Sequence, residues 1–458
     1  MARFVWSTPL PVPPEEAFAW HERPGAFERL LPPWQEVRIL GRQGTIAPGG
    51  RLTLAVKKGP LWLRWEAEHG EWERGRFFTD RLVRGPFPRW EHHHGFLPRE
   101  GGGCLLEDRV DYDLPLGAVG RLVSGRFMER DLRRLFAFRH ERTRRDLLRH
   151  AAYRDRPRLR VAVTGASGLV GSALVPFLTT GGHWVLRLGR RPRREEGEGL
   201  FDPAAGKLEG DRLEGFDAVV HLAGENIAAG RWTPERKEAI RRSRVEGTAI
   251  LARTLASLRR PPGVLVCASA VGFYGHRPEG EVTEDWGAGE GFLAEVCKEW
   301  EAAAEPARKA GIRVVHLRTG VVLSRRGGAL ARMLPAFRAG AGGPVGSGRQ
   351  GFPWIALDDL VGLIHFLLFE EVRGPVNAVA PEAVSQARFA RVLGRVLRRP
   401  AFLPLPAPAV RLLFGEMGQA LLLEGASVRP VRAEAAGFAF QWPSLEEALR
   451  WELGLFQG

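Results

Sequence analysis

Cysteine is scarce in this chain of 458 residues, which contains only Cys104, Cys267 and Cys297. Three scattered cysteines exclude a disulfide framework and a cysteine-based zinc site, and they suit a reducing compartment. The first residues show no signal-peptide pattern, so we expect a cytoplasmic protein. No apolar run is long enough to cross a bilayer, and we therefore expect no membrane span.

Lysine is also rare, since only six of the 67 basic residues are lysine and the rest are arginine. The formal net charge is +14. A basic excess of this size can indicate nucleic-acid binding when it gathers on one face or accompanies a known motif. Here it is spread along the chain and no such motif accompanies it, so we expect no nucleic-acid partner.

The stretch 160–192 is the most informative part of what is present. It reads as an apolar strand at Val161–Thr164, a turn with glycine at every third position, an amphipathic helix and a second strand. In such a turn the glycines allow a sharp bend, the approach of a phosphate and close helix–strand packing. The helix N-terminus adds partial positive charge. The pattern predicts a dinucleotide site with contacts from Gly165, Ser167, Gly168, Leu169, Val170 and Gly171.

The end of the second strand indicates which dinucleotide binds. An NAD site would place an acidic residue there to hold the ribose 2′-hydroxyl, but the chain has Gly189 followed by Arg190 and Arg191. Because the planar guanidinium donates in pairs to a phosphate, NADP is favoured over NAD. The alternative is a solvated basic loop, since Arg193 and Arg194 continue the run.

A third strand runs through the apolar segment 217–222 and ends in small residues. Ligands of doubly wound sheets lie beyond the carboxyl ends of the strands. We therefore expect further cofactor contacts from this strand end, namely from Leu222, Ala223, Gly224 and Glu225.

Several motifs of the middle region resemble those of the extended short-chain dehydrogenase/reductase superfamily: TGASGLVG, VVHLAGENI, RVEGT, SAVGFYG and WIALDDL. HLAGENI, FLAEVCKEWE and GSGRQGFPWI more narrowly resemble its nucleoside-diphosphate-sugar epimerase-like branch. The resemblance covers about residues 158–400. It implies an NADP-binding Rossmann domain with a substrate lobe.

The chain departs from that superfamily at the catalytic pair. Its reductases use Tyr-x-x-x-Lys, in which the lysine lowers the pKa of the tyrosine so that it exchanges a proton with the substrate. None of the three tyrosines here has a lysine four residues later, and Ala294 stands where Lys298 would require a tyrosine. The usual tyrosine-based mechanism therefore looks lost.

Two residues remain as catalytic candidates by this resemblance. Ser269 fits the hydroxyl residue that ends a strand next to the substrate, or it is a plain strand-end serine. Lys298 would hold the nicotinamide ribose hydroxyls, or it is a solvated helix residue. Glu225, Tyr274 and Cys297 are weaker substitutes for the missing acid. In the glycine-rich loop 340–352, Arg349 would suit an anionic substrate, although a mobile surface loop is equally consistent.

The first 150 residues show a different pattern. A short helix starts at Pro13, five alternating strands lie between residues 51 and 112, and a long helix covers about Val119–Arg149. This order resembles the START-like cyclase and lipid-carrier superfamily, which implies an α+β helix-grip fold. Its apolar interior holds a hydrophobic ligand or is a packed core. His92 and His94 share a strand face, but without companion ligands at suitable spacing we interpret them as structural or surface residues and expect no metal site.

The sequence thus predicts three parts: a START-like helix-grip domain at residues 1–152, an α/β Rossmann domain with a doubly wound parallel sheet and a substrate lobe at 158–403, and a small helical extension at 404–458 that packs on this lobe. Ser444 and Glu447 should form an N-terminal capping box for the last helix. The first functional hypothesis is an NADP-dependent oxidoreductase or epimerase-like enzyme acting on an unidentified small molecule. The second is a non-catalytic, NADP-responsive binding protein whose first domain carries a hydrophobic ligand. The oligomeric state is left open.

Overall fold

The computed structural model describes residues 1–115, 117–192 and 196–456; the side chains of residues 117–123 lie outside the description. The chain divides into two compact units. The first is mainly Met1–Arg158, and the second consists of Leu159–Val175 and His183–Leu455. Within the described residues, no helix is both long and apolar enough to span a membrane.

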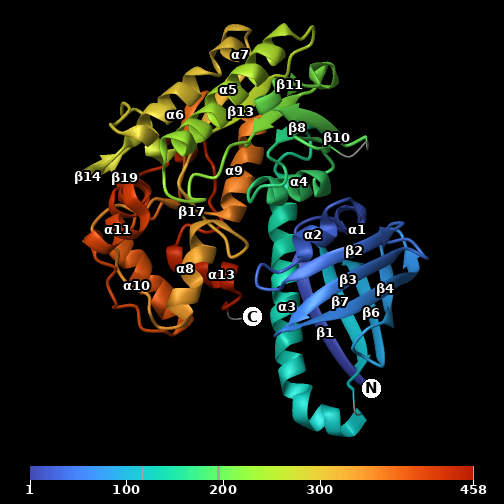
Figure 1. Cartoon of the computed structure of the whole chain (residues 1–458). Coiled ribbons are helices and arrows are strands. Elements are labelled where there is room, and N and C mark those ends of the chain that lie inside the picture. The colour runs from blue at the N-terminus through green and yellow to red at the C-terminus, as the bar shows by residue number, and fades with distance from the viewer. Residues whose placement is uncertain (116, 193–195, 457–458) are drawn as a thin grey trace. The chain divides into compact units, whose positions relative to one another are not determined.

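The first unit is built on a seven-stranded antiparallel sheet with the order β1-β7-β6-β5-β4-β3-β2 (blue to cyan in Figure 1). Its strands are β1 (Ala2–Leu10), β2 (Val37–Gln43), β3 (Arg51–Lys58), β4 (Leu61–Glu73), β5 (Phe77–Arg84), β6 (Arg89–Pro98) and β7 (Cys104–Asp113). Its helices are α1 (Pro14–Glu22), α2 (Ala26–Leu30) and α3 (Gly117–Ala151). Leu132 and Phe136 of α3 pack with Phe4 and Val110 of the sheet, which joins the long helix to the curved face. The START-like helix-grip fold is confirmed.

The sequence analysis predicted β3 to β7 but missed β1 and β2. These two strands are the edges of the sheet. An edge strand has a single hydrogen-bonded neighbour, and β2 is exposed over most of its length. It therefore lacks the apolar alternation by which buried strands are recognised.

The second unit contains an eight-stranded sheet with the order β11-β10-β9-β8-β12-β13-β15-β18. Neighbouring strands are parallel except for the short β11 at one edge. The strands are β8 (Arg160–Thr164), β9 (Trp184–Gly189), β10 (Glu198–Asp202), β11 (Lys207–Leu208), β12 (Ala218–His221), β13 (Val264–Ala270), β15 (Arg313–Thr319) and β18 (Gly374–Ala378). The chain runs outward from β8 through β9 and β10 and then returns to β12 beside β8. This is a doubly wound Rossmann sheet whose switch point lies between β8 and β12.

Helices cover both faces of this sheet. Trp300, Ala307 and Leu251 pack with the strand residues Val219 and Leu265, which places α5, α6 and α7 together on one face (Figure 1). The helices are α4 (Gly171–Thr180), α5 (Pro234–Ser257), α6 (Phe292–Ala302), α7 (Glu305–Lys309), α8 (Gly328–Arg338), α9 (Leu357–Phe369) and α10 (Gln386–Leu397). The predicted α/β fold class is confirmed.

The C-terminal part adds α11 (Ala407–Gly418), β19 (Ala426–Val428), α12 (Val431–Ala435) and α13 (Leu445–Leu453). β19 pairs in parallel with β14 (Arg277–Val282), while β16 (Val321–Leu323) pairs with β17 (Trp354–Ala356). Ser444 stands at the N-cap of α13, but the predicted capping box is wrong because its side chain makes no capping hydrogen bond. The carboxylate of Glu382 accepts the Leu445 N–H at 2.7 Å and satisfies that helix end instead.

Candidate functional site

The glycine-rich turn brings the ends of β8 and β12 together at the switch point. Gly165 has a backbone φ of +68°, an angle that residues other than glycine rarely adopt. A Cβ atom there would lie 2.8 Å from the backbone carbon of Leu222 and 2.9 Å from the nitrogen of Ala223. Both the backbone angle and the space therefore require glycine, and the two predicted cofactor segments lie in contact.

The turn leads directly into α4, which begins at Gly171. A Cβ atom on Gly171 would lie 2.3 Å from the carbonyl oxygen of Gly165, so the helix packs against the turn as the glycine pattern predicted. Within the described part of the chain, the N–H groups of Leu169 and Val170 donate to no protein acceptor. Ser167 and Gly168 are exposed beside them. Free N–H groups at a helix N-terminus are suited to an anion.

Arg190 and Arg191 follow β9 and are both exposed. Neither has an ion-pair partner among the residues that the structure describes. A Cβ atom on Gly189 would meet none of the described residues within 4 Å, so these residues leave space at the strand end. Two unpaired guanidinium groups beside open space fit the predicted phosphate contact. Arg193 and Arg194, on which the alternative of a basic loop rested, lie outside the described residues.

A buried hydrogen-bond network that the sequence analysis missed holds the ends of β8 and β12 together beneath this site. The Thr164 hydroxyl accepts the N–H groups of Leu222 and Ala223, each at 3.2 Å, and lies 2.7 Å from Nδ1 of His221. Nε2 of His221 lies 3.1 Å from the hydroxyl of Thr248. Burial lowers the pKa of His221 to about 4, so the imidazole is neutral near pH 7. Its hydrogen bonds align the end of β12 with the end of β8.

The tautomer of His221 follows from these contacts. Because the Thr164 hydroxyl already accepts two N–H groups, it donates to Nδ1, and Nε2–H then donates to Thr248. Thr248 also accepts the indole N–H of Trp300 at 2.9 Å. His221 and Thr248 belong to the HLAG and RVEGT motifs, so the motifs were the available signal for this network.

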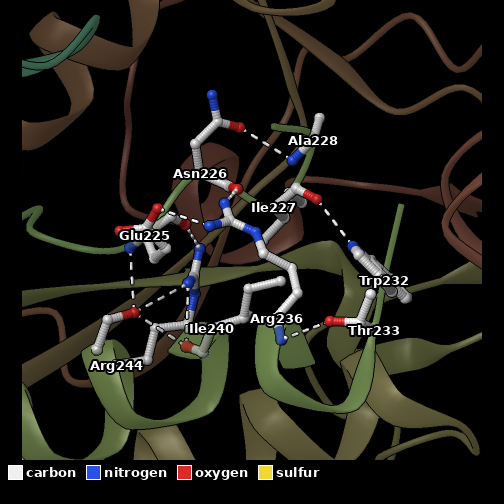
Figure 2. Close-up of polar contacts among 10 residues, drawn as sticks. Glu225, Asn226, Ile227, Ala228, Trp232, Thr233, Arg236, Ile240 and Arg244 are labelled. Carbon is white, nitrogen blue, oxygen red and sulfur yellow. Dashed lines mark hydrogen bonds and ion pairs between the residues drawn. The ribbon is translucent and has the colours of Figure 1, made fainter. Parts of the chain in front are cut away.

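Glu225 lies in the loop after β12, and its neighbours are shown in Figure 2. Its carboxylate pairs with Arg236 at 2.9 Å, and its carbonyl oxygen accepts from Arg244 at 3.0 Å. Arg244 is partly buried, lies 5.1 Å from the ring centre of Trp300, and has a pKa lowered by burial. Trp232 donates its indole N–H to the carbonyl of Ile227 at 2.8 Å. The loop is thus held by arginines of α5, and Glu225 is an ion-paired residue of this loop.

Ser269 is buried at the end of β13, with 3 % of its surface exposed. Its hydroxyl donates to Glu301 at 2.7 Å, and Glu301 accepts two further hydrogen bonds from Arg318 at 2.8 and 2.9 Å. Since side chains alternate along a strand, the next residue, Ala270, occupies the opposite face and has no hydroxyl. The structure therefore directs the Ser269 hydroxyl toward a buried ion pair.

Tyr274 and Cys297 are also buried within the unit. The Tyr274 hydroxyl donates to Asn377 at 2.7 Å and accepts from Arg318 at 3.0 Å, and burial raises the pKa of Tyr274. Burial likewise raises the pKa of the Cys297 thiol to about 12. A proton donor or nucleophile needs access and a pKa nearer the working pH. Both side chains are arranged as packed structural groups.

Lys298 is exposed on α6, while Ala294, one turn earlier, is buried. An open depression of about 490 Å³ lies beside the start of this helix, with Trp232, Lys237 and Phe292 in its lining. None of the predicted site residues lines it, so we assign it neither cofactor nor substrate. The structure thus brings the predicted cofactor segments around Gly165 and Leu222 together, whereas Ser269 points into a separate buried network.

Comparison with known proteins covers all parts of the chain. Residues 161–379 match the model of the NAD dependent epimerase/dehydratase family, residues 10–138 that of polyketide cyclase/dehydrase and lipid transport proteins, and residues 405–452 a domain of unknown function. An epimerase family protein of Mycobacterium tuberculosis is 43% identical over 290 residues, which is 63% of this chain and 96% of the relative. The human epimerase family protein SDR39U1 is 39% identical over 296 residues, or 64% and 99% of the two chains.

Two solved structures extend the comparison. A nucleoside-diphosphate sugar epimerase from Corynebacterium glutamicum has a TM-score of 0.81 at 34% identity and covers 99% of this chain and 91% of its own. The human SDR39U1 structure with NADPH has a TM-score of 0.59 at 37% identity, over 64% of this chain and 99% of its own.

Proposed function

The chain belongs to the epimerase family, and we propose that its second unit binds NADP(H) with Arg190 and Arg191 at the 2′-phosphate. The observation that carries the proposal is the contact between the turn at Gly165 and the backbone of Leu222 and Ala223. It places free N–H groups at the switch point of a doubly wound sheet, where dinucleotides bind. The human relative, whose structure contains NADPH, supports the choice of nucleotide.

Each of the predicted contacts has a defined part in this proposal. The backbone N–H groups of Leu169 and Val170 hold the pyrophosphate, with Ser167 and Gly168 lining its path. Leu222, Ala223 and Gly224 would line the cofactor site, and Glu225 anchors their loop to α5. The bound nucleotide would supply a hydride donor or acceptor.

Of the two functional hypotheses, the side chains favour the binding protein. An oxidoreductase or epimerase-like enzyme needs a group that exchanges a proton with its substrate. Ser269, Tyr274 and Cys297 are buried with protein partners or with raised pKa, and Glu225 is paired with Arg236. We therefore propose an NADP(H)-binding member of the family without tyrosine-dependent catalysis.

Titration of the purified chain with NADPH and NADH by calorimetry tests the nucleotide assignment. We expect NADPH to bind more tightly, and Arg190→Ala or Arg191→Ala to weaken NADPH by about 10- to 100-fold, the worth of a charge-assisted hydrogen bond. NADH affinity should not change. Arg187→Ala is the matched control, because Arg187 is an exposed arginine of β9, the strand that Arg190 and Arg191 follow, and it pairs with Glu198. Equal affinity for NADH, or unchanged NADPH affinity in both variants, contradicts the proposal.

The enzyme hypothesis retains one accessible group, Lys298. Incubation of the NADPH complex with nucleotide sugars and small carbonyl compounds, followed at the nicotinamide absorbance, tests it directly. Turnover that is lost in Lys298→Met but kept in Lys309→Met would establish catalysis and overturn the binding-protein assignment.

Two predictions concern the rest of the protein. Aromatic and aliphatic side chains form two buried clusters in the first unit, and a hydrophobic ligand of this unit stays a prediction, to be checked by native mass spectrometry of the purified chain. The three cysteines are free and buried, which supports our proposal of a reducing, cytoplasmic location.

A further inference from the structure

Three imidazoles and two carboxylates meet inside the first unit, against one face of its sheet. We name the group the His–Asp cluster and define it as Asp80 of β5, His92 and His94 of β6, Asp108 of β7 and His140 of α3. The strand register places Asp80 across from His92, and His94 across from Asp108. Directly opposite residues share a face, so three adjacent strands direct these side chains to one place.

The cluster is enclosed by apolar side chains. The His94 ring stacks on Phe78 with ring centres 4.1 Å apart, and the His92 ring meets Phe136 edge-on at 5.3 Å. His92 is 5 % exposed and Asp108 is 3 % exposed, while Asp80 is the member nearest solvent. Of the two sequence-based interpretations of His92 and His94, structural or surface residues, their burial excludes the surface one. The companion ligands that the sequence analysis did not find next to these histidines are the aspartates Asp80 and Asp108, which lie on the strands flanking β6.

The two carboxylates contact the imidazoles in different ways. On one side, Asp108 lies 3.1 Å from Nε2 of His92, 2.5 Å from Nδ1 of His94 and 2.6 Å from Nε2 of His140. On the other side, a single oxygen of Asp80 lies 3.3 Å from Nδ1 of His92 and 3.4 Å from Nε2 of His94. The contacts of Asp108 have hydrogen-bond lengths, whereas those of Asp80 are longer than usual.

We propose that Asp80, His92 and His94 bind a divalent transition-metal ion of the Zn²⁺ type. The three ligand atoms lie within 4.8 Å of one another. In a tetrahedral site with metal–ligand bonds of about 2.05 Å, neighbouring ligand atoms are about 3.3–3.4 Å apart. The two distances from Asp80 match that edge, and they exceed the roughly 3 Å edge of an octahedral site with similar bonds.

Asp108 completes the arrangement as a positioning residue. A histidine that binds a metal donates its other ring N–H to a carboxylate, which fixes the tautomer and directs the lone pair at the ion. Asp108 contacts Nε2 of His92 and Nδ1 of His94, and these are the nitrogens that do not face Asp80. The hydrogen bond between Nε2 of His92 and Asp108 directs the Nδ1 lone pair of His92 toward Asp80, while Nδ1 of His94 lies at ion-pair distance from the same carboxylate.

Three protein ligands leave one position for an oxygen donor such as water. Asp80 is the least buried of the three ligands, so its side of the site is the nearest to solvent. His69 lies across from Asp80 on β4, and its buried Nδ1 has no hydrogen-bond partner among the residues described, so it is the second source of a fourth ligand.

The test uses the untagged full-length chain, freed of metal with a chelator and then dialysed against Zn²⁺. We expect one retained equivalent by elemental analysis in the wild type. Asp80→Asn and His94→Gln should retain none, and Asp108→Asn should bind about 10- to 100-fold more weakly, as outer-shell losses do. His93→Gln is the matched control: His93 is the intervening residue of β6, points to the opposite face and stacks on Phe77. It should bind like the wild type.

Two further measurements test the proposal even if one of the variants does not fold. Co²⁺ in place of Zn²⁺ should give the strong visible absorption of a four-coordinate ion, and Zn²⁺ should raise the thermal unfolding midpoint of wild type and His93→Gln alike. A wild type that retains no Zn²⁺, a weak six-coordinate Co²⁺ spectrum, or equal Zn²⁺ retention in folded Asp80→Asn would overturn it.

Discussion

The protein buries histidines at two centres whose surroundings are opposite in kind. In the first unit, His92 lies between the carboxylates of Asp80 and Asp108. In the second unit, His221 lies between the hydroxyls of Thr164 and Thr248. Both rings are inaccessible to solvent, so the identity of the neighbouring groups accounts for the difference between them.

The protonation of the two rings differs accordingly. Burial alone would lower the pKa of His92, but hydrogen bonds to Asp108 and Asp80 raise it to about 9. Nothing opposes burial at His221, whose pKa falls to about 4. Neighbouring carboxylates stabilise positive charge, either as a proton on the imidazole or as a metal ion bound to it. Neighbouring hydroxyls instead stabilise the neutral imidazole in one tautomer. The first centre is suited to binding a cation and the second to fixing backbone geometry.

The largest expected effect comes from removing the negative charge at the first centre. In chelator-treated protein, Asp108→Asn should destabilise the first unit by about 3–5 kcal/mol, because buried imidazoles lose their charged partner. Hydrogen exchange of the β6 and β7 amides in the full-length chain measures this loss. Asp111→Asn on the same strand is the control and should change little, since its partner Arg3 is exposed. If the β6 and β7 amides of Asp108→Asn exchange as slowly as those of the wild type, the carboxylate does not stabilise the first centre and the two centres do not differ in this way.

Acid should act on the second centre. The pKa of His221 is about 4 in the folded state and about 6.5 when unfolded, so the unfolded chain binds more protons below pH 6.5. The stability that depends on the neutral ring is therefore complete above pH 6.5 and declines by about 3 kcal/mol as the pH falls to 4. His221→Asn should lose this component of the pH dependence of hydrogen exchange in β12. The same pH slope in both proteins would show that His221 is not held neutral.

A smaller effect should follow from removing one hydroxyl at that centre. Thr248→Val leaves the ring N–H of His221 and the indole N–H of Trp300 without an acceptor, at a cost of about 1–3 kcal/mol. Because the network aligns the ends of β8 and β12, NADPH affinity should fall as well. Calorimetry and thermal unfolding check both results. Thr254→Val, a partly exposed change on the same helix, is the control, and equal behaviour of the two variants would refute the role of the network.

The smallest expected effect is that of Ser269→Ala, whose hydroxyl contacts a carboxylate outside both centres. Loss of its hydrogen bond to Glu301 should cost about 1 kcal/mol and leave NADPH affinity unchanged. A large loss of NADPH binding or of turnover, with stability maintained, would instead place Ser269 at the substrate.

The cofactor site could be predicted to a large extent because its signals are local. The turn requires a positive φ at Gly165 and leaves no room for a side chain at Gly171. Both requirements belong to one short turn, whose glycine spacing can be recognised in the sequence. Arg190 and Arg191 directly follow the strand that positions them. The catalytic candidates were harder, because the direction of the Ser269 side chain depends on Glu301 and Arg318, which lie on other elements.

The sequence by itself determined the two folds, the dinucleotide turn and the absence of the tyrosine–lysine pair, since these follow from periodicity, glycine spacing and residue identity. Only the tertiary structure decided what the histidines do. Asp80 and Asp108 lie 12 or more residues from the paired histidines, and sheet register rather than spacing brings them together. Likewise, His221 meets Thr164 because the parallel strands β8 and β12 align their ends, and it meets Thr248 because helix α5 packs against the sheet. Buried electrostatics depends on neighbours in space, and only the register of the folded sheet and the packing of its helices supply those neighbours.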